Sequence, residues 1–415
     1  MLPLLLGLAL QAPAPLHLQD LLKEARDQNP ELRAALAELR AARASVAPAG
    51  ALDDPMLMLQ LWNGPVDFSS VPLMLQLSET FPLGGKRSRR REAARADERS
   101  GEANAAAKAR DVEEAVANAY FDLFMIDRTL DVDRELEGLV AAMTEAASAR
   151  IASGKGELAD QLDSQGETLQ LQADEETATA QRVSASARLA TLLDRDPELP
   201  LGPTGVPALL PSLPAQATLR DRALASRPEL AAADAAVAAA NAQLGLAQAE
   251  RIPDLGLSAG EMHAFGGPPG VRDFLFLGVQ TNLPIFDGEK NGPKIEAATA
   301  RLDAMREAVR ALRNRILAEV ADAYAHVEAE EHLIHLHHRL IPLSRQAFES
   351  SISSYAAGRS DFLRVLDGAR KLQMHELDLA AHLGAYEQAL AALEHAVGTD
   401  LGLAAHAEEG SLEAH

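Results

Sequence analysis

The tetrapeptide Asn29-Pro30-Glu31-Leu32 returns 198 residues later as Arg227-Pro228-Glu229-Leu230. Further along the chain, Phe81-Pro82-Leu83 returns as Leu283-Pro284-Ile285, by which point the offset has grown to 202. The offset then holds at 204 for three more pairs: Ala119-Tyr120 with Ala323-Tyr324, Gly154 with Gly358, and Leu162-Asp163 with Leu366-Asp367. An offset that holds, grows slightly and holds again indicates a duplication with short insertions, and its period is far too long for a solenoid.

The composition narrows the class of protein. A length of 415 residues suggests two or three domains, but the duplication favours one architecture built from two halves. The sequence contains no cysteine, which excludes a disulfide framework, a thiolate metal site and a cysteine-linked lipid anchor. The net charge of −22 argues against nucleic acid as a partner. A low aromatic content of 4% beside abundant Ala, Leu, Glu and Arg is typical of long, closely packed helices.

Residues 1–14 are apolar and end in Ala-Pro-Ala, as the core of a secretory signal does. A buried N-terminal segment is the alternative interpretation. We expect no later apolar run to approach the ~18–20 residues of a transmembrane helix. If the protein crosses a bilayer, the sequence therefore predicts that it does so through strands.

The first repeat, residues 15–195, reads as a helix, a hairpin and two further helices. Leucines at helical spacing predict the first helix over 16–47, and alternation predicts a β-hairpin over 55–80. One face of that hairpin is wholly leucine, at Leu57, Leu59, Leu61, Leu73, Leu75 and Leu77. The proline-free stretch 86–152 predicts a helix on the order of 100 Å long. After a glycine turn, a return helix follows over 157–193.

A Pro-rich linker, residues 196–215, leads to the second repeat, residues 216–398. Its predicted elements are a helix over 216–250, strands over 254–263 and 273–283, a long helix over 293–357 and a return helix over 360–397. A loose tail, 399–415, is expected to follow. In each repeat the first and return helices together nearly equal the long helix in length. Stacked end to end, they would cover its apolar stripe, as packing requires.

Four strands are too few to close a membrane barrel, which needs at least eight. An open sheet edge in lipid would leave unpaired backbone groups that cost several kcal/mol each. Other copies of the chain must therefore complete the sheet, and the sequence predicts a ring oligomer.

Several short motifs occur in order in both repeats. They are the x-Pro-Glu-Leu openings, the junctions Phe81–Lys86 and Leu283–Gly288, and the turns Ala149–Gly154 and Ser353–Gly358, each followed nine residues later by Leu-Asp. In these features the chain resembles the outer membrane factor family, the TolC-like exit ducts of tripartite efflux and secretion systems. The resemblance covers nearly the whole chain after the signal-like segment.

The resemblance implies a mainly α fold with a small β part, assembled as a homotrimer. Its twelve strands would form one barrel in the outer membrane of a Gram-negative-type cell, above a periplasmic tunnel of helices. A periplasmic adaptor and an inner-membrane pump would dock at the tunnel tip. Such a duct is no enzyme, needs no cofactor, and would conduct metal cations or drugs passively. The His-bearing second half and the short first extracellular loop favour the cation-efflux branch.

A soluble, elongated coiled-coil scaffold without a pore is the alternative function. The leucine-faced hairpins discriminate between the two, because a soluble scaffold gains nothing from strands with an apolar outward face. No nucleophile–base pair or phosphate-binding glycine loop favours an enzyme.

Two glycines mark the predicted periplasmic tip. Gly154 and Gly358 suit a helix C′ position, where φ is positive. The resemblance places them at the adaptor-docking hairpins, together with the basic residues that follow them, Lys155 and Arg359.

Asp160, Asp163 and Asp367 follow these turns. In a three-fold assembly each would form a ring of carboxylates, an arrangement that selects cations in pores, although solvated acidic surface is an equal alternative. Arg364 stands where family members often carry a second acidic residue. It would weaken cation binding or pair with Asp163 or Asp367 to keep the tip shut, in which case Arg364→Ala would raise conductance.

Two further features of the second repeat are ambiguous. His332, His335 and His338 are i,i+3 neighbours that could share a metal ion, although exposed histidines on a helix are more often only solvated. Pro342 corresponds to Gly138 at the offset of 204, and both weaken a helix. The pair is either chance or a matched bend where the tunnel begins to taper.

Overall fold

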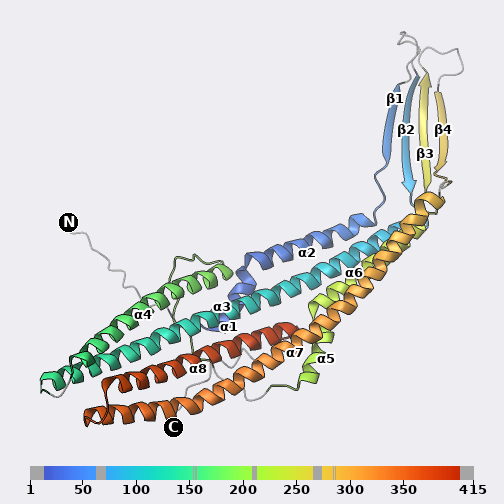
Figure 1. The fold of residues 1–415 in the computed structure, drawn as a ribbon. Coiled ribbons are helices and arrows are strands. Elements are labelled where there is room, and N and C mark those ends of the chain that lie inside the picture. Colours follow the sequence, from blue (N-terminus) through green and yellow to red (C-terminus); the bar gives the residue numbers. More distant parts are fainter. Residues whose placement is uncertain are drawn as a thin grey trace, which may run out of the picture. The chain divides into compact units, whose positions relative to one another are not determined.

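The computed structural model describes residues 14–61, 72–152, 154, 157–207, 213–264, 273–283, 285 and 287–401. The fold is mostly helical with one small antiparallel sheet, as predicted (Figure 1). The first repeat contains α1 (Leu18–Gln28), α2 (Pro30–Ala49), β1 (Met56–Leu61), β2 (Pro72–Phe81), α3 (Lys86–Ala152) and α4 (Leu158–Leu192). The second contains α5 (Gln216–Ser226), α6 (Pro228–Ala249), β3 (Leu255–Ala264), β4 (Asp273–Thr281), α7 (Asp287–Ala356) and α8 (Phe362–Val397).

The chain divides into two compact units. One comprises Met1–Arg33, Ala107–Arg227 and Arg315–His415, and it holds the helical hairpins α3–α4 and α7–α8. The other comprises Ala34–Ala106 and Pro228–Asn314, and it holds the sheet. We refer to them as the hairpin unit and the sheet unit. Both long helices, α3 and α7, contribute to each.

The first helix of each repeat is broken in two, which corrects the single helices expected over 16–47 and 216–250. The breaks fall at Asn29, with ψ of 124°, and Arg227, with ψ of 119°. Each residue precedes a proline, and the proline ring disfavours the helical conformation in the residue before it. Pro30 and Pro228 then begin the next helix, at the position where a missing N–H costs nothing.

Asn29 and Arg227, the residues at the two breaks, make equivalent contacts through different side-chain groups, an amide and a guanidinium. Asn29 is 3% exposed, and its side chain accepts from the N–H groups of Glu31 and Leu32, which caps α2. Asn29 Nδ2 also donates to the carbonyl of Leu192, at 2.9 Å. Arg227 Nη1 donates to the carbonyl of Ala396 at 3.0 Å, 204 positions beyond Leu192. Both residues therefore fasten the break to the end of the return helix.

The core of the hairpin unit is built around α3 in the first repeat. Val116, Phe121, Leu123 and Phe124 are fully buried there and pack with residues of α1 and α4. The Tyr120 hydroxyl donates to the Leu16 carbonyl at 3.3 Å and accepts from the N–H of Gly205 at 3.0 Å, in the linker. These contacts hold α1 and the predicted linker against the long helix.

The four strands form one antiparallel sheet in the order β1-β2-β3-β4, so β1 and β4 are its edges. The register pairs Leu57 with Leu77 and Leu59 with Leu75, which puts these leucines on one face. On β4 the same face carries Leu275, Leu277 and Val279, which are 88%, 90% and 75% exposed. It also carries two acidic residues, Glu79 on β2 and Glu261 on β3. We call this the apolar face. The other face is mixed. It carries the polar or small residues Gln60, Gln76, Ser78, Ser258, Gly260 and Gln280 and the apolar residues Met56, Met58, Met74, Met262, Phe274 and Phe276.

Two expectations about helices are wrong. The second long helix begins at Asp287 rather than at 293, because Asp287 accepts from Asn291 Nδ2 at 2.7 Å and pairs with Arg251 at 3.2 Å, which stabilises an earlier first turn. Among the described residues, Gln216–Ala249 is long and apolar enough to span a bilayer by composition, although no such run was expected. Its apolar character comes largely from alanine, and the break at Arg227 interrupts it.

The segments 62–71 and 265–272, predicted as strand connections, lie outside the described residues, as do 1–13 and 402–415.

Candidate functional site

The two predicted tip glycines end their helices in the left-handed conformation. Gly154 has φ of +72° and Gly358 has φ of +69°, values that only glycine adopts without strain. The Gly154 N–H donates to Ile151 O and the Gly358 N–H to Tyr355 O, both at 2.9 Å. Arg359 is exposed beside Gly358. Lys155 lies outside the described residues.

A tyrosine joins the two helical hairpins near these turns. Tyr355, on α7, donates its hydroxyl proton to Asp160 Oδ2 on α4 at 3.0 Å. Arg150, at the end of α3, lies over the Tyr355 ring with Cζ 4.2 Å from its centroid and donates to the Tyr355 carbonyl. Phe362 of α8 contacts the same ring edge-on at 5.8 Å. All four helices therefore meet at this side chain.

The surroundings of Tyr355 keep its hydroxyl protonated. Burial, followed by the hydrogen bond to Asp160, raises its pKa to about 12. Since the hydroxyl keeps its proton at every physiological pH, it remains a donor to Asp160.

A second link lies further along the same helices. Glu167 on α4 is buried, and its Oε1 accepts from Arg370 Nε on α8 at 3.0 Å. The hydrogen bond to Glu167 raises the pKa of Arg370, which stays charged. We refer to the Tyr355–Asp160–Arg150 and Glu167–Arg370 contacts together as the tip links. The sequence analysis singled out Asp160 as a candidate. Arg150 and Tyr355 lie inside the two turn motifs, but their contacts and those of Glu167 and Arg370 were not predicted, because the partners lie about two hundred residues away.

The other predicted constriction residues are exposed in the single chain. Asp163 on α4 and Arg364 and Asp367 on α8 all lie at the surface. The Arg364 N–H is bonded to Asp361 Oδ1 at 3.1 Å, which caps α8. The described chain brings Asp160 to Tyr355 and leaves these three side chains open to other copies or to water. Their role at a constriction stays a prediction.

Gly138 and Pro342, the predicted bend, lie inside the continuous helices α3 and α7. Pro342 lacks the N–H that would bond the carbonyl of His338, and its exposed position leaves that carbonyl accessible to water. The bend itself stays a prediction.

Among the described residues, the predicted histidine trio is not part of the one group of three potential metal ligands that the structure brings together, and metal binding by the trio stays a prediction. His332, His335 and His338 are all exposed, and His332 Nδ1 donates to the carbonyl of Glu328 on its own helix at 2.6 Å. The buried histidine of this helix is His337, at 7% exposure. The helical seam of α7 could have identified it, because buried Val320, Val327 and Ile334 recur every seven residues and His337 follows Ile334 by three.

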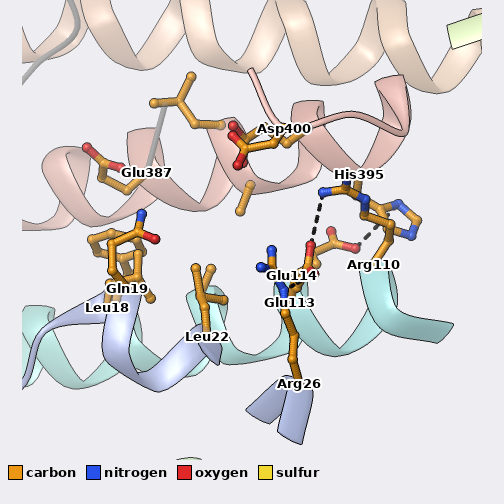
Figure 2. Close-up of a pocket in the computed structure, with 15 residues that line it drawn as sticks. Leu18, Gln19, Leu22, Arg26, Arg110, Glu113, Glu114, Glu387, His395 and Asp400 are labelled. Atoms are coloured by element: carbon orange, nitrogen blue, oxygen red, sulfur yellow. Dashed lines mark hydrogen bonds and ion pairs between the residues drawn. The ribbon is translucent and has the colours of Figure 1, made fainter. Parts of the chain in front are cut away.

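A small cavity of about 90 Å³ lies between α1, α3 and α8 in the hairpin unit (Figure 2). Glu113 accepts from Arg26 at 2.6 Å and from Arg110 at 3.0 Å, and Figure 2 shows Glu387 apart from this group. Burial, and next the charge of Glu394, raises the pKa of Glu387 to about 8. The cavity is far smaller than the roughly 300–1,000 Å³ of small-molecule sites, so it is not a substrate pocket.

Comparison with known proteins settles the family. The family model described as outer membrane efflux protein matches residues 21–195 and 219–399, nearly all of both repeats. The chain belongs to the outer membrane efflux protein family.

Relatives and solved structures agree over most of the chain. The efflux protein is 26% identical to the cobalt-zinc-cadmium resistance protein CzcC of Cupriavidus metallidurans, over 94% of this chain and 91% of CzcC. It is 29% identical to the nickel and cobalt resistance protein CnrC of the same organism, over 78% of this chain and 77% of CnrC. The open state of the Neisseria gonorrhoeae MtrE outer membrane channel has the same fold, with a TM-score of 0.79, 22% identity and coverage of 92% and 89%.

These findings confirm the predicted TolC-like fold and the role as an efflux duct of the outer membrane with a large periplasmic part. They do not favour the soluble scaffold. The apolar face of the sheet fits this location, because its many exposed leucines need lipid or protein to cover them.

Proposed function

We propose that the efflux protein is the homotrimeric exit duct of a tripartite pump that exports divalent transition-metal cations. A periplasmic adaptor and an inner-membrane pump would supply the cargo and the energy. CzcC and CnrC, which are similar over most of this chain, are both named for resistance to such cations.

The observation that carries the assembly is the open-edged sheet. Strands β1 and β4 are its edges, and four strands fall short of the eight that the smallest membrane barrels need. Three copies would supply twelve. Pairing β4 of one copy with β1 of the next would remove every open edge and turn the apolar face toward lipid. Gln76 and Gln280 would then face the lumen, together with apolar neighbours such as Met74 and Phe276.

Charge supports a cation as the cargo. The protein carries a net charge of −22, and the predicted constriction residues Asp160, Asp163 and Asp367 are carboxylates. In a three-fold assembly each becomes a ring of three, and rings of Asp or Glu are how pores favour cations. Arg364 would reduce the negative charge of these rings where it pairs with Asp163 or Asp367.

The turns at Gly154 and Gly358 would dock the adaptor, with Lys155 and Arg359 beside them. The tip links would hold the duct narrow at rest, because they join the two hairpins of one chain. Docking would then shift the equilibrium toward an open tip, which requires the adaptor to bind the open form more tightly.

Metal resistance tests the cargo. A strain that lacks this chain should regain growth on zinc, cobalt or cadmium when the chain is restored together with its pump and adaptor. Drug susceptibility should change little. Restored drug resistance without metal resistance would overturn the choice of cargo while leaving the duct intact.

If the tip links hold the duct closed, removing one hydroxyl group should weaken the closed state. Tyr355→Phe removes the bond to Asp160, and a hydrogen bond to a charged group contributes about 1.5–3 kcal/mol. We expect the single-channel conductance, or the open fraction, to rise roughly tenfold or more in planar bilayers.

Tyr324→Phe is the matched control for this gate, because it removes the same hydroxyl from the same helix at the position equivalent to Tyr120. It should leave conductance unchanged. Equal conductance of Tyr355→Phe and the unmodified protein would show that the link does not hold the tip closed.

A further inference from the structure

Two histidines and an aspartate from the two helices of the second hairpin, α7 and α8, come together within the hairpin unit. His337 belongs to α7, and His375 and Asp378 belong to α8. Their potential ligand atoms, one from each residue, all lie within 4.8 Å of one another. His337 is 7% exposed and the other two are partly buried. The cluster is separate from the tip links and from the cavity of Figure 2.

Two nitrogens in this cluster are buried without a partner. Nδ1 of His337 and Nδ1 of His375 have no hydrogen-bond partner among the described residues. Buried polar groups in native proteins are bonded in the large majority of cases. In the same unit the buried side chains of Asn29, Glu167 and Arg227 follow that rule, whereas Asn118 Oδ1, Ser186 Oγ and Ser360 Oγ are buried without a described partner and lie outside this cluster. Two orphaned ring nitrogens beside a carboxylate therefore indicate a site for an electron-pair acceptor.

A fourth histidine lies next to this trio. The ring of His382 is 5.1 Å from the ring of His337, centroid to centroid. Its Nδ1 is 2.8 Å from Glu330 Oε2 on α7, so Nε2 is the ring nitrogen that could bind a metal ion. Metal-ligating histidines commonly have one ring nitrogen held by a carboxylate in this way, since that fixes the tautomer and the ring orientation.

We propose that His337, His375 and Asp378 form a binding site for one divalent transition-metal cation per chain, which fastens α7 to α8. Two imidazoles and a carboxylate are the nitrogen and oxygen ligands that Zn²⁺ accepts, and imidazole also suits Ni²⁺ and Cu²⁺. Tetrahedral Zn²⁺ needs donor atoms about 3.3 Å apart, so the side chains rotate inward on binding. His382 or water fills the fourth position.

The first repeat lacks this chemistry at the equivalent positions. The offset of 204 places Asp133 at the position of His337, Leu171 at that of His375 and Asp174 at that of Asp378. Asp133 is buried like His337, but its Oδ1 accepts a hydrogen bond from Gln373 at 2.8 Å. The first hairpin therefore satisfies its buried polar group with an amide, and only the second offers imidazoles. The expected stoichiometry is one ion per chain and three per trimer.

Titration of the full-length trimer in detergent with Zn²⁺ tests the site. Calorimetry should show one saturable site per chain. His375→Gln and Asp378→Asn, which preserve side-chain size, should each lower the affinity at least tenfold. His382→Ala should lower it less than either. Saturating Zn²⁺ should raise the thermal unfolding temperature of the unmodified trimer and not that of Asp378→Asn.

The double variant His335→Gln/His338→Gln is the matched control. It removes two exposed histidines from the same helix and should leave the Zn²⁺ affinity unchanged. The proposal is overturned if the unmodified protein shows no saturable site, if His375→Gln and Asp378→Asn retain full affinity, or if only the double variant loses it. Because the readout is binding to the purified trimer, failure here leaves the proposed cargo untouched.

Discussion

Leu277→Arg is expected to remove the efflux protein from the outer membrane. Leu277 lies in the middle of β4, 90% exposed, between Leu275 and Val279 on the apolar face. In the proposed barrel this side chain faces the hydrocarbon near mid-depth. An arginine at the bilayer midplane of a membrane barrel costs about 2–4 kcal/mol, and three copies multiply that cost in the trimer.

The measurement is the amount of trimer in the outer-membrane fraction, by immunoblot of unheated samples. Gln280→Arg is the matched control, because it adds the same charge to the same strand on the opposite face. It should assemble normally, since that face would line a water-filled lumen. Equal amounts of trimer for Leu277→Arg and Gln280→Arg would show that the apolar face does not meet lipid.

Glu387→Gln is expected to stabilise the hairpin unit at alkaline pH. Glu387 is 7% exposed on α8, and burial raises its pKa from 4.5 to about 8. A carboxyl whose folded pKa is raised contributes stability that is fully present below pH 4.5 and is lost as the pH rises through 8. At about 1.36 kcal/mol per pKa unit, that loss is roughly 5 kcal/mol per chain.

The glutamine variant cannot ionise and therefore escapes this loss. Its unfolding temperature in detergent should exceed that of the unmodified protein by a growing margin from pH 5 to pH 8 and a constant one above. Glu296→Gln, an exposed position on α7, removes the same charge and should leave the pH profile unchanged. Parallel profiles for Glu387→Gln and the unmodified protein would contradict the buried, protonated carboxyl.

Much of the architecture could be predicted because the duplication repeats local signals. The alternating leucines of β1 and β2 predicted a hairpin with one apolar face, and the proline-free stretch predicted a single long helix, α3. The broken helices were missed although Pro30 and Pro228 were visible. Leucine periodicity continues across Asn29, and periodicity alone does not report a change of backbone direction at one residue.

The candidate sites were harder to predict because their partners are distant in sequence. Asp160 was singled out because it follows the first glycine turn, but its bond to Tyr355 depends on how α4 packs against α7. The histidines of α7 were noticed as a group, yet the proposed metal site uses His337, which was not among the three singled out. Its role depends on the helical seam and on His375 and Asp378, which α8 brings to it after the turn at Gly358.

The unpaired rims of β1 and β4 impose an order on biogenesis. A lone subunit leaves these edges unpaired, so the proposed trimeric barrel would become competent for insertion only when three subunits meet. Production of finished ducts should therefore fall more steeply than subunit supply when secretion slows. Until three subunits meet, each would expose unpaired strand edges and the leucines of the apolar face to the periplasm. We therefore expect periplasmic chaperones to protect the single subunits from aggregation.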